Sequence, residues 1–183
     1  MIDLFKVQQD LKFANEAFAS FCQLPDERQW VYFIDHLENS LTKLNKLTEG
    51  NKLNNEVQKV FKLKKKDSLL IYIRVSRNVI AHTAKELTKM KVVGVDDNPP
   101  FIIEAVEICH TDGTTTKVDT SKGEYFKYIY ELESVIDKDK NIIPPPSEHL
   151  RKKINNPTSP QEVGSLALQF YTNLFETIKA KNI

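Results

Sequence analysis

Residues 68–87 read SLLIYIRVSRNVIAHTAKEL, an apolar helical pattern that carries an arginine, an asparagine and a histidine within six residues. The apolar spacing predicts one amphipathic helix, and Asp67 or Ser68 can cap its start. Arg77 falls where this pattern expects an apolar side chain. A buried guanidinium needs a partner or an anion, so Arg77 is either paired with an acid of the chain or positioned to bind a ligand.

The segments around this stretch also have the periodicity of amphipathic helices. Apolar residues recur at spacings of three and four over 4–21 and again over 30–44, and Gly50 is a plausible stop for the second helix. A shorter helix is expected over 54–61. Near the end of the chain, Ser159–Glu162 reads SPQE, a capping box with proline at the first helical position. It predicts a last helix whose apolar face contains Val163, Leu166, Phe170, Leu174 and Ile178.

Between these helices the period changes at Lys91. The segments KVVGV and FIIEAVEIC are rich in β-branched residues, and Asp112-Gly113 is a turn-forming pair, so two or three short antiparallel strands are expected. Helical spacing returns at Tyr125, Ile129, Leu132 and Ile136. The proline run 144–146 then predicts an extended connector.

The prediction is a single, mainly α-helical domain over residues 1–183. Residues 1–90 form a helical core, residues 91–120 a small antiparallel β insertion, and residues 121–183 the C-terminal helices with a proline-rich connector. A chain of this length can bury one sizeable core.

Composition restricts the class of partner. The formal net charge is +1, so anion binding requires a local patch. No stretch has the length and apolar character of a membrane span, and the start MIDLFKVQQD lacks the order of a secretory signal. The two cysteines, Cys22 and Cys109, are too few for a disulfide framework and are not spaced as metal ligands. A cytoplasmic protein without a membrane partner, metal or cofactor is expected.

The segment Arg77-Asn78-Val79-Ile80-Ala81-His82 resembles the R-x-x-x-x-H signature of HEPN domains (higher eukaryotes and prokaryotes nucleotide-binding). In that family a polar residue often follows the arginine, as Asn78 does here. Family members are helical bundles with the signature on a late helix. The resemblance covers roughly residues 1–90 and implies a HEPN-like up-and-down bundle, to which the β insertion and the C-terminal helix are additions.

The resemblance also implies a function. Many members are metal-independent endoribonucleases that act as toxins or defence effectors, in homodimers that bring two signatures into one cleft. Carried onto this chain, Arg77 and His82 are the catalytic pair, Asn78 is the polar helper, RNA is the substrate, and a protein antitoxin is a partner. Other members have lost activity and only bind nucleotide, RNA or protein.

The chemistry of these side chains suits RNA cleavage. Without a metal, the 2′-hydroxyl must lose its proton, the leaving 5′-oxygen must gain one, and the added charge on phosphorus must be neutralised. Histidine has an ordinary pKa of about 6.5, which suits proton transfer near neutrality. Arginine stays charged and can hold two phosphate oxygens, and an asparagine can donate a hydrogen bond or orient the imidazole.

Helical geometry favours a dimer. Arg77 and His82 lie about 140° apart around an ideal helix, whereas Arg74, Asn78 and His82 form one row. Either the long Arg77 side chain wraps toward His82, or the helix ends there, or Arg77 meets the His82 of a partner chain. The dimer is the simplest of the three, because it brings a second Arg–His pair to the same phosphate. Arg74 is a candidate supporting phosphate contact, and so is Lys85. The basic run 62–66 lies just before the helix and is either solvated or tracks an RNA backbone.

Two further hypotheses stay open beside the ribonuclease. One is a catalytically inactive HEPN-like module that dimerises and binds a nucleotide, RNA or a protein. The other is a helical scaffold in which Arg77 is enclosed and paired within its own chain. Asp35, His36 and Glu38 are expected to face the signature helix, where an acid can orient His82 or pair with Arg77. His110 and His149 have no companions at metal-ligand spacing and are assigned no role.

Overall fold

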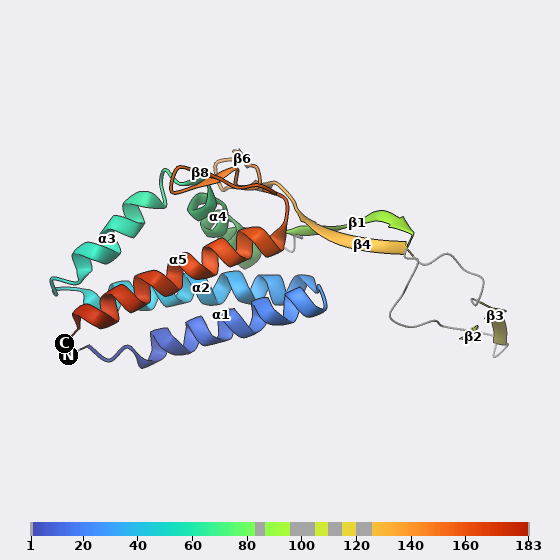
Figure 1. Ribbon diagram of the computed structural model, residues 1–183, viewed down its shortest axis with the longest axis horizontal. Helices are drawn as coiled ribbons and strands as arrows, with labels where there is room; N and C mark the ends of the chain where they lie inside the picture. The colour runs from blue at the N-terminus through green and yellow to red at the C-terminus, as the bar shows by residue number, and fades with distance from the viewer. Residues whose placement is uncertain (1, 83–86, 96–104, 110–114, 120–125, 183) are drawn as a thin grey trace. The chain divides into compact units, whose positions relative to one another are not determined.

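The computed structural model describes residues 2–82, 87–95, 105–109, 115–119 and 126–182. Over these ranges the chain is mainly helical, as predicted, with short strands between the fourth and fifth helices (Figure 1). The helices are α1 (Phe5–Gln23), α2 (Glu27–Thr48), α3 (Asn54–Leu63), α4 (Ser68–His82) and α5 (Pro160–Lys181). The strands are β1 (Thr88–Val95), β2 (Ala105–Cys109), β3 (Thr115–Asp119), β4 (Phe126–Leu132), β5 (Val135–Ile136), β6 (Ile142–Ile143), β7 (Glu148–His149) and β8 (Lys152–Lys153).

The chain forms two compact units, residues 1–89 with 130–183 and residues 90–129. In the first unit α1, α2 and α5 lie lengthwise beside one another, and α4 packs against α2 and α5 (Figure 1). The predicted apolar faces of the first two helices are buried, because they meet across this packing. The two chain ends also meet: Ile2 N donates to Asn182 Oδ1 at 2.9 Å, and Asn182 Nδ2 donates to Ile2 O at 2.8 Å.

Capping side chains fix where the helices begin. Asp26 precedes α2 and accepts a hydrogen bond from Arg28 N at 2.8 Å. Ser159 precedes α5 and accepts from Glu162 N at 3.3 Å, which is one half of the predicted capping box. The Glu162 carboxylate does something different from the expected return bond: it accepts from the backbone N–H groups of Asn155 and Asn156, both at 2.9 Å. The box therefore also fastens the preceding loop to the helix.

The end of α2 and the buried face of α5 were each predicted in part. Gly50 follows α2 with a φ of 73°, a left-handed conformation that favours glycine, so the predicted stop is confirmed. On α5 the predicted Val163 and Ile178 are fully buried, whereas between them the most buried positions are Ala167, Tyr171 and Phe175. The predicted Leu166, Phe170 and Leu174 are partly buried, so α5 packs with a face wider than the predicted stripe.

The helix predicted over 125–136 is wrong, because this segment contains β4 and β5. Its aromatic and apolar residues also recur at every second position in FKYIYEL, and this shorter period is the one that the backbone follows. Strand β4 pairs with β1. Two backbone bonds continue the extended course: Leu132 N donates to Thr158 O at 2.8 Å, and Glu133 N donates to Leu87 O at 2.9 Å. Helix α5 is thus the one helix described after residue 121.

The segment after β4 packs against α4 in two small hairpins. β5 pairs with β6 and β7 pairs with β8, both antiparallel. Tyr72 Oη of α4 donates to the carbonyl of Glu133 at 2.8 Å just before the first hairpin. Both hairpins contact α4, so they can form walls of a site on this helix.

The second unit contains an antiparallel pair within the predicted β insertion. β2 and β3 pair with Ala105 opposite Asp119 and Cys109 opposite Thr115. The predicted turn at Asp112-Gly113 lies outside the described residues.

Candidate functional site

Helix α4 is fixed at its start by a buried acid. Asp67 precedes the helix, and its Oδ1 accepts a hydrogen bond from Leu70 N at 3.1 Å, so the predicted cap is confirmed. Leu69, Leu70 and Ile73 are fully buried and set the core-facing side of the helix. The remaining face presents Arg74, Arg77 and Asn78.

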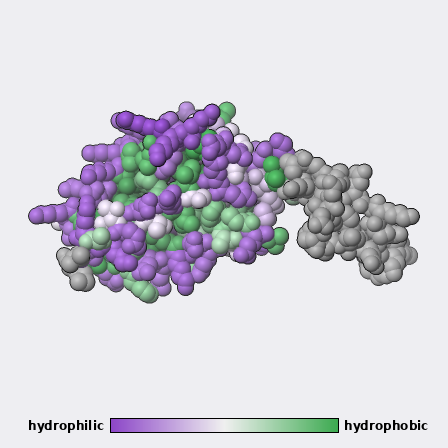
Figure 2. All heavy atoms as spheres, viewed as in Figure 1, coloured by the Kyte–Doolittle hydropathy of each residue, from purple (hydrophilic) through white to green (hydrophobic). Residues whose placement is uncertain are grey.

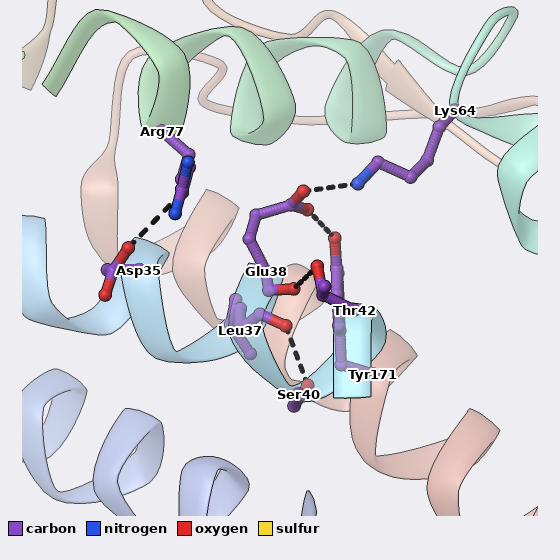
Figure 3. Close-up of polar contacts among 8 residues, drawn as sticks. All are labelled: Asp35, Leu37, Glu38, Ser40, Thr42, Lys64, Arg77 and Tyr171. Atoms are coloured by element: carbon purple, nitrogen blue, oxygen red, sulfur yellow. Dashed lines mark hydrogen bonds and ion pairs between the residues drawn. The ribbon is translucent and has the colours of Figure 1, made fainter. Parts of the chain in front are cut away.

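Arg77 lies at the rim of the core and bridges α4 to α2. Its Nε lies 3.3 Å from Asp35 Oδ1, and the two side chains keep 38% and 41% of their surface exposed (Figure 3). Arg77 is therefore paired with an acid of its own chain but is not enclosed. An ion pair this exposed contributes on the order of 0–1 kcal/mol, so a phosphate can compete with Asp35 for the guanidinium.

Arg74 and Asn78 are exposed and line one cavity of about 440 Å³. They stand one turn apart on α4, in the row that the helical spacing predicts. The opposite wall is the turn of the first hairpin, residues 136–139. The structure thus brings two of the predicted site residues together at an opening in the surface.

Charges of both signs surround this cavity. Asp137 and Asp139 line it together with Lys138 and Arg74. Hydrogen bonds from Asn141 lower the pKa of Asp137 below its ordinary value, and the nearby Arg74 acts in the same direction. The carboxylate is therefore ionised at neutral pH, and it opposes a phosphate while Arg74 attracts one.

The two other predicted residues cannot be added to this geometry. His82 is the last residue of α4, and its side chain lies outside the described part of the structure. Lys85 falls within 83–86, which is also outside the described ranges. Arg77, Asn78 and Arg74 are thus located, whereas the catalytic pairing of Arg77 with His82 stays a prediction.

The three polar residues of α2 contact different partners. Asp35 meets Arg77 on α4, one of the two roles expected for an acid here. The expectation that His36 faces the signature helix is wrong, because its Nδ1 lies 3.6 Å from Asp10 Oδ1 and its ring lies 5.3 Å from that of Phe13, both on α1. Consecutive residues on a helix lie about 100° apart, so one face cannot hold both.

Glu38 belongs to a buried polar network. Its carboxylate accepts hydrogen bonds from Lys64 Nζ and from Tyr171 Oη (Figure 3). Glu38, Lys64 and Tyr171 are 8%, 4% and 2% exposed, and they join α2, the α3–α4 connection and α5. The sequence carries no local sign of this network, because its residues lie up to 133 positions apart.

Burial shifts the pKa values within this network. Loss of solvent lowers the pKa of Lys64 below its ordinary value of 10.5, while Glu38 acts in the opposite direction, and Arg74 and Arg77 lower it further. Loss of solvent and the Glu38 carboxylate raise the pKa of Tyr171 well above 10. The tyrosine is therefore a hydrogen-bond donor at neutral pH.

Lys64 also contributes to a second cavity of about 330 Å³. Lys65 and Arg74 line the same cavity, as do the ring of Phe61 and the amides of Asn45 and Gln58. Arg74 thus lies between the two cavities. Cations, an aromatic ring and amides are groups that bind phosphates and nucleobases.

A second buried contact, between an acid and a histidine, was not predicted from the sequence. Asp67 Oδ1 lies 3.0 Å from His149 Nδ1, and both residues are 8% exposed. The ring of His149 packs edge-on against Phe170 at a centroid distance of 5.2 Å. His149, to which no role was assigned, thus links the second hairpin to the start of α4 and the face of α5.

No protein-family model, curated protein or solved structure matches this chain. Within the described ranges, histidine, cysteine and acidic side chains do not gather in groups that could hold a metal ion. Among those same residues, every helix is too short or too polar to cross a membrane.

Proposed function

We propose that this chain is a HEPN-like endoribonuclease that acts as a homodimer and needs no metal. Arg77 and His82 are its catalytic pair, Asn78 is the polar helper, and Arg74 supports the phosphate. The observation that carries the proposal is the state of Arg77. Its side chain keeps 38% of its surface exposed and forms only a weak pair with Asp35, and the next residue, Asn78, lines an open cavity.

In the proposed reaction the ribose 2′-oxygen forms a bond to phosphorus while the bond from phosphorus to the 5′-oxygen breaks. One His82 accepts the 2′-hydroxyl proton, and His82 of the second protomer donates a proton to the leaving oxygen. Arg77 neutralises the charge that develops on the phosphate. The dimer supplies the second His82 imidazole, which a single chain lacks.

Replacing His82 tests this assignment. The wild-type chain should cut mixed cellular RNA in the presence of EDTA, and His82→Ala should lower the rate by about 10²–10⁴-fold. His36→Gln is the matched control. This histidine faces α1, so its replacement should leave the cleavage rate unchanged. Circular dichroism and light scattering on each variant separate loss of chemistry from loss of the fold or dimer.

The inactive module is the second candidate, and two observations favour it. Asp35 already occupies Arg77, and the carboxylates of Asp137 and Asp139 stand at the cavity beside Asn78. Such a module would bind RNA, a nucleotide or a protein, an antitoxin included, without cutting RNA. Intact RNA after incubation with purified wild-type dimer would reject the ribonuclease and favour this alternative.

A further inference from the structure

Three consecutive basic residues lie on the second small hairpin. Arg151, Lys152 and Lys153 are all exposed, whereas the flanking His149 and Ile154 are buried. The net charge of the chain is only +1, so this group is a local concentration of positive charge.

Hydrogen bonds fasten this hairpin to the first residues of the signature helix. Asp67 Oδ2 accepts from Leu150 N at 2.7 Å, and Asp67 Oδ1 contacts His149 Nδ1. Ser68 Oγ donates to Glu148 O at 2.5 Å and accepts from Glu148 N at 3.1 Å. The hairpin therefore has a fixed position next to α4.

The backbone of the turn is also well defined. Leu150 and Arg151 have φ angles of 49° and 65°, the left-handed conformation that residues other than glycine seldom adopt. Asp67, which accepts from Leu150 N, holds the first of them in place. The backbone that carries Arg151 is consequently held in one conformation.

Two lysines of the basic run 62–66 lie at the same end of α4. Lys65 and Lys66 are exposed and directly precede Asp67, so they stand next to the fastened hairpin although 85 residues separate Lys66 from Arg151. Figure 2 shows strongly hydrophilic residues along the upper edge of the view, where Figure 1 places β8.

Arg74 extends the positive charge from there to the candidate site, where Asp137 and Asp139 also line the first cavity. Lys65 and Arg74 share the second cavity, and Arg74 and Asn78 share the first. We define the basic track by its exposed cations, Lys65, Lys66, Arg74, Arg151, Lys152 and Lys153. Glu148 is the exposed acid in the hairpin, and the buried Asp67 is paired with His149.

We infer that the basic track binds the sugar–phosphate backbone of single-stranded RNA and guides the strand to Arg74 and Asn78. This inference rests on the proposed function, since it names the path of that substrate. Phe61 in the second cavity favours a single strand, because an unpaired base can stack on its ring while Lys65 and Arg74 hold phosphates.

Salt dependence of binding tests the track directly. Affinity for a labelled 12-nucleotide oligouridylate is measured by fluorescence anisotropy from 50 to 400 mM KCl, in the His82→Ala background so that the RNA stays intact. The slope of log K against log salt is negative, and we express it as its magnitude, which each lost phosphate contact reduces by about 0.7 for a single strand. Replacing Arg151, Lys152 and Lys153 by glutamine should therefore lower the slope by about 2 and weaken binding.

A matched variant removes the same charge elsewhere. Lys6, Lys46 and Lys179 are exposed on α1, α2 and α5, and replacing all three by glutamine should leave the slope unchanged. Lys65→Gln with Lys66→Gln changes the track without touching the hairpin, and it should lower the slope by about 1.4.

The outcomes separate this inference from the proposed function. If wild type cuts RNA and the hairpin variant binds with an unchanged slope, the track is wrong and the nuclease stands. If the slope falls as expected but wild type never cuts RNA, the track stands and the nuclease is wrong. Equal affinity for a 12-base-pair RNA duplex, or binding to phosphatidylserine vesicles in place of RNA, would overturn the inference.

Discussion

The buried network of Glu38, Lys64 and Tyr171 gives the sharpest test of how the helices are held together. We predict that Lys64→Met, which keeps the length of the side chain and removes its charge, destabilises the protein strongly. Lys64 and Glu38 are 4% and 8% exposed, so the substitution leaves a carboxylate buried without its cation. Removing one partner of such a pair costs about 3–5 kcal/mol in the free energy of unfolding.

The same physics predicts that removing the whole network is mild. In Glu38→Leu with Lys64→Met and Tyr171→Phe, no buried charge or hydroxyl loses its partner, and apolar groups of similar size fill the space. Exchanges of this kind range from neutral to stabilising by about 1–4 kcal/mol. The triple variant should therefore be more stable than Lys64→Met alone, although it carries more substitutions.

Urea unfolding followed by circular dichroism measures these differences, and thermal unfolding provides a second readout. For a chain of this size each kcal/mol moves the melting temperature by about 2–4 °C, so Lys64→Met should melt about 6–20 °C below wild type. The neighbouring Lys65→Met is the control, because Lys65 is exposed and its loss should change stability by less than about 0.5 kcal/mol. A loss below about 1 kcal/mol for Lys64→Met would refute the argument, since it would mean that the ammonium reaches water through the second cavity.

Two further predictions concern pH and packing. Burial raises the pKa of Tyr72 and of Tyr171 above the ordinary value of 10, so above pH 10 the unfolded chain releases phenolic protons that the folded chain keeps. The free energy of unfolding should then fall with rising pH by up to about 1.4 kcal/mol per pH unit for each tyrosine. Lys64 acts in the opposite direction up to pH 10.5, because its pKa is lower in the folded chain than in the unfolded chain. Urea titrations from pH 9 to 11 should show a smaller decline in Tyr72→Phe than in wild type. At Gly164 an added Cβ would lie 2.3 Å from Cε2 of Phe18, whose ring stacks on Phe33 at 4.9 Å, so Gly164→Val should cost about 1–3 kcal/mol. Thermal unfolding should show little change in the control Ser165→Val at the exposed neighbouring position, and equal losses in the two variants would contradict close packing of α1 on α5.

Local signals in the sequence predicted most of the helical architecture. Asp67 and Ser159 act as caps at the expected places, because capping depends on residues within a few positions of one another. The helix predicted over 125–136 was wrong, because the aromatic and apolar residues of this stretch fit both a helical period and the two-residue period of a strand. Pairing with β1 decided between them, and such pairing is not encoded locally.

Contacts between distant segments explain what the sequence could not predict about the site. Asp35 was among the candidates for pairing with Arg77, because neighbouring helices of a bundle face each other. The contact of Asp67 with His149 spans 82 residues, and that of Glu38 with Tyr171 spans 133. Neither leaves a signal in a single sequence, because a polar residue at a helical position is compatible with solvent until the partner is known.

The two ion pairs that join α2 to the region of α4 differ in what they contribute. The pair of Glu38 and Lys64 is buried, so its loss should threaten the fold, and a structural role accounts for it fully. The pair of Asp35 and Arg77 keeps more than a third of each side chain in solvent, so it adds at most about 1 kcal/mol to stability. Structure alone thus gives little reason for an arginine at position 77, whereas binding of a phosphate beside Asn78 gives one. The proposed catalytic role of Arg77 therefore rests on the difference in solvent exposure between the two ion pairs.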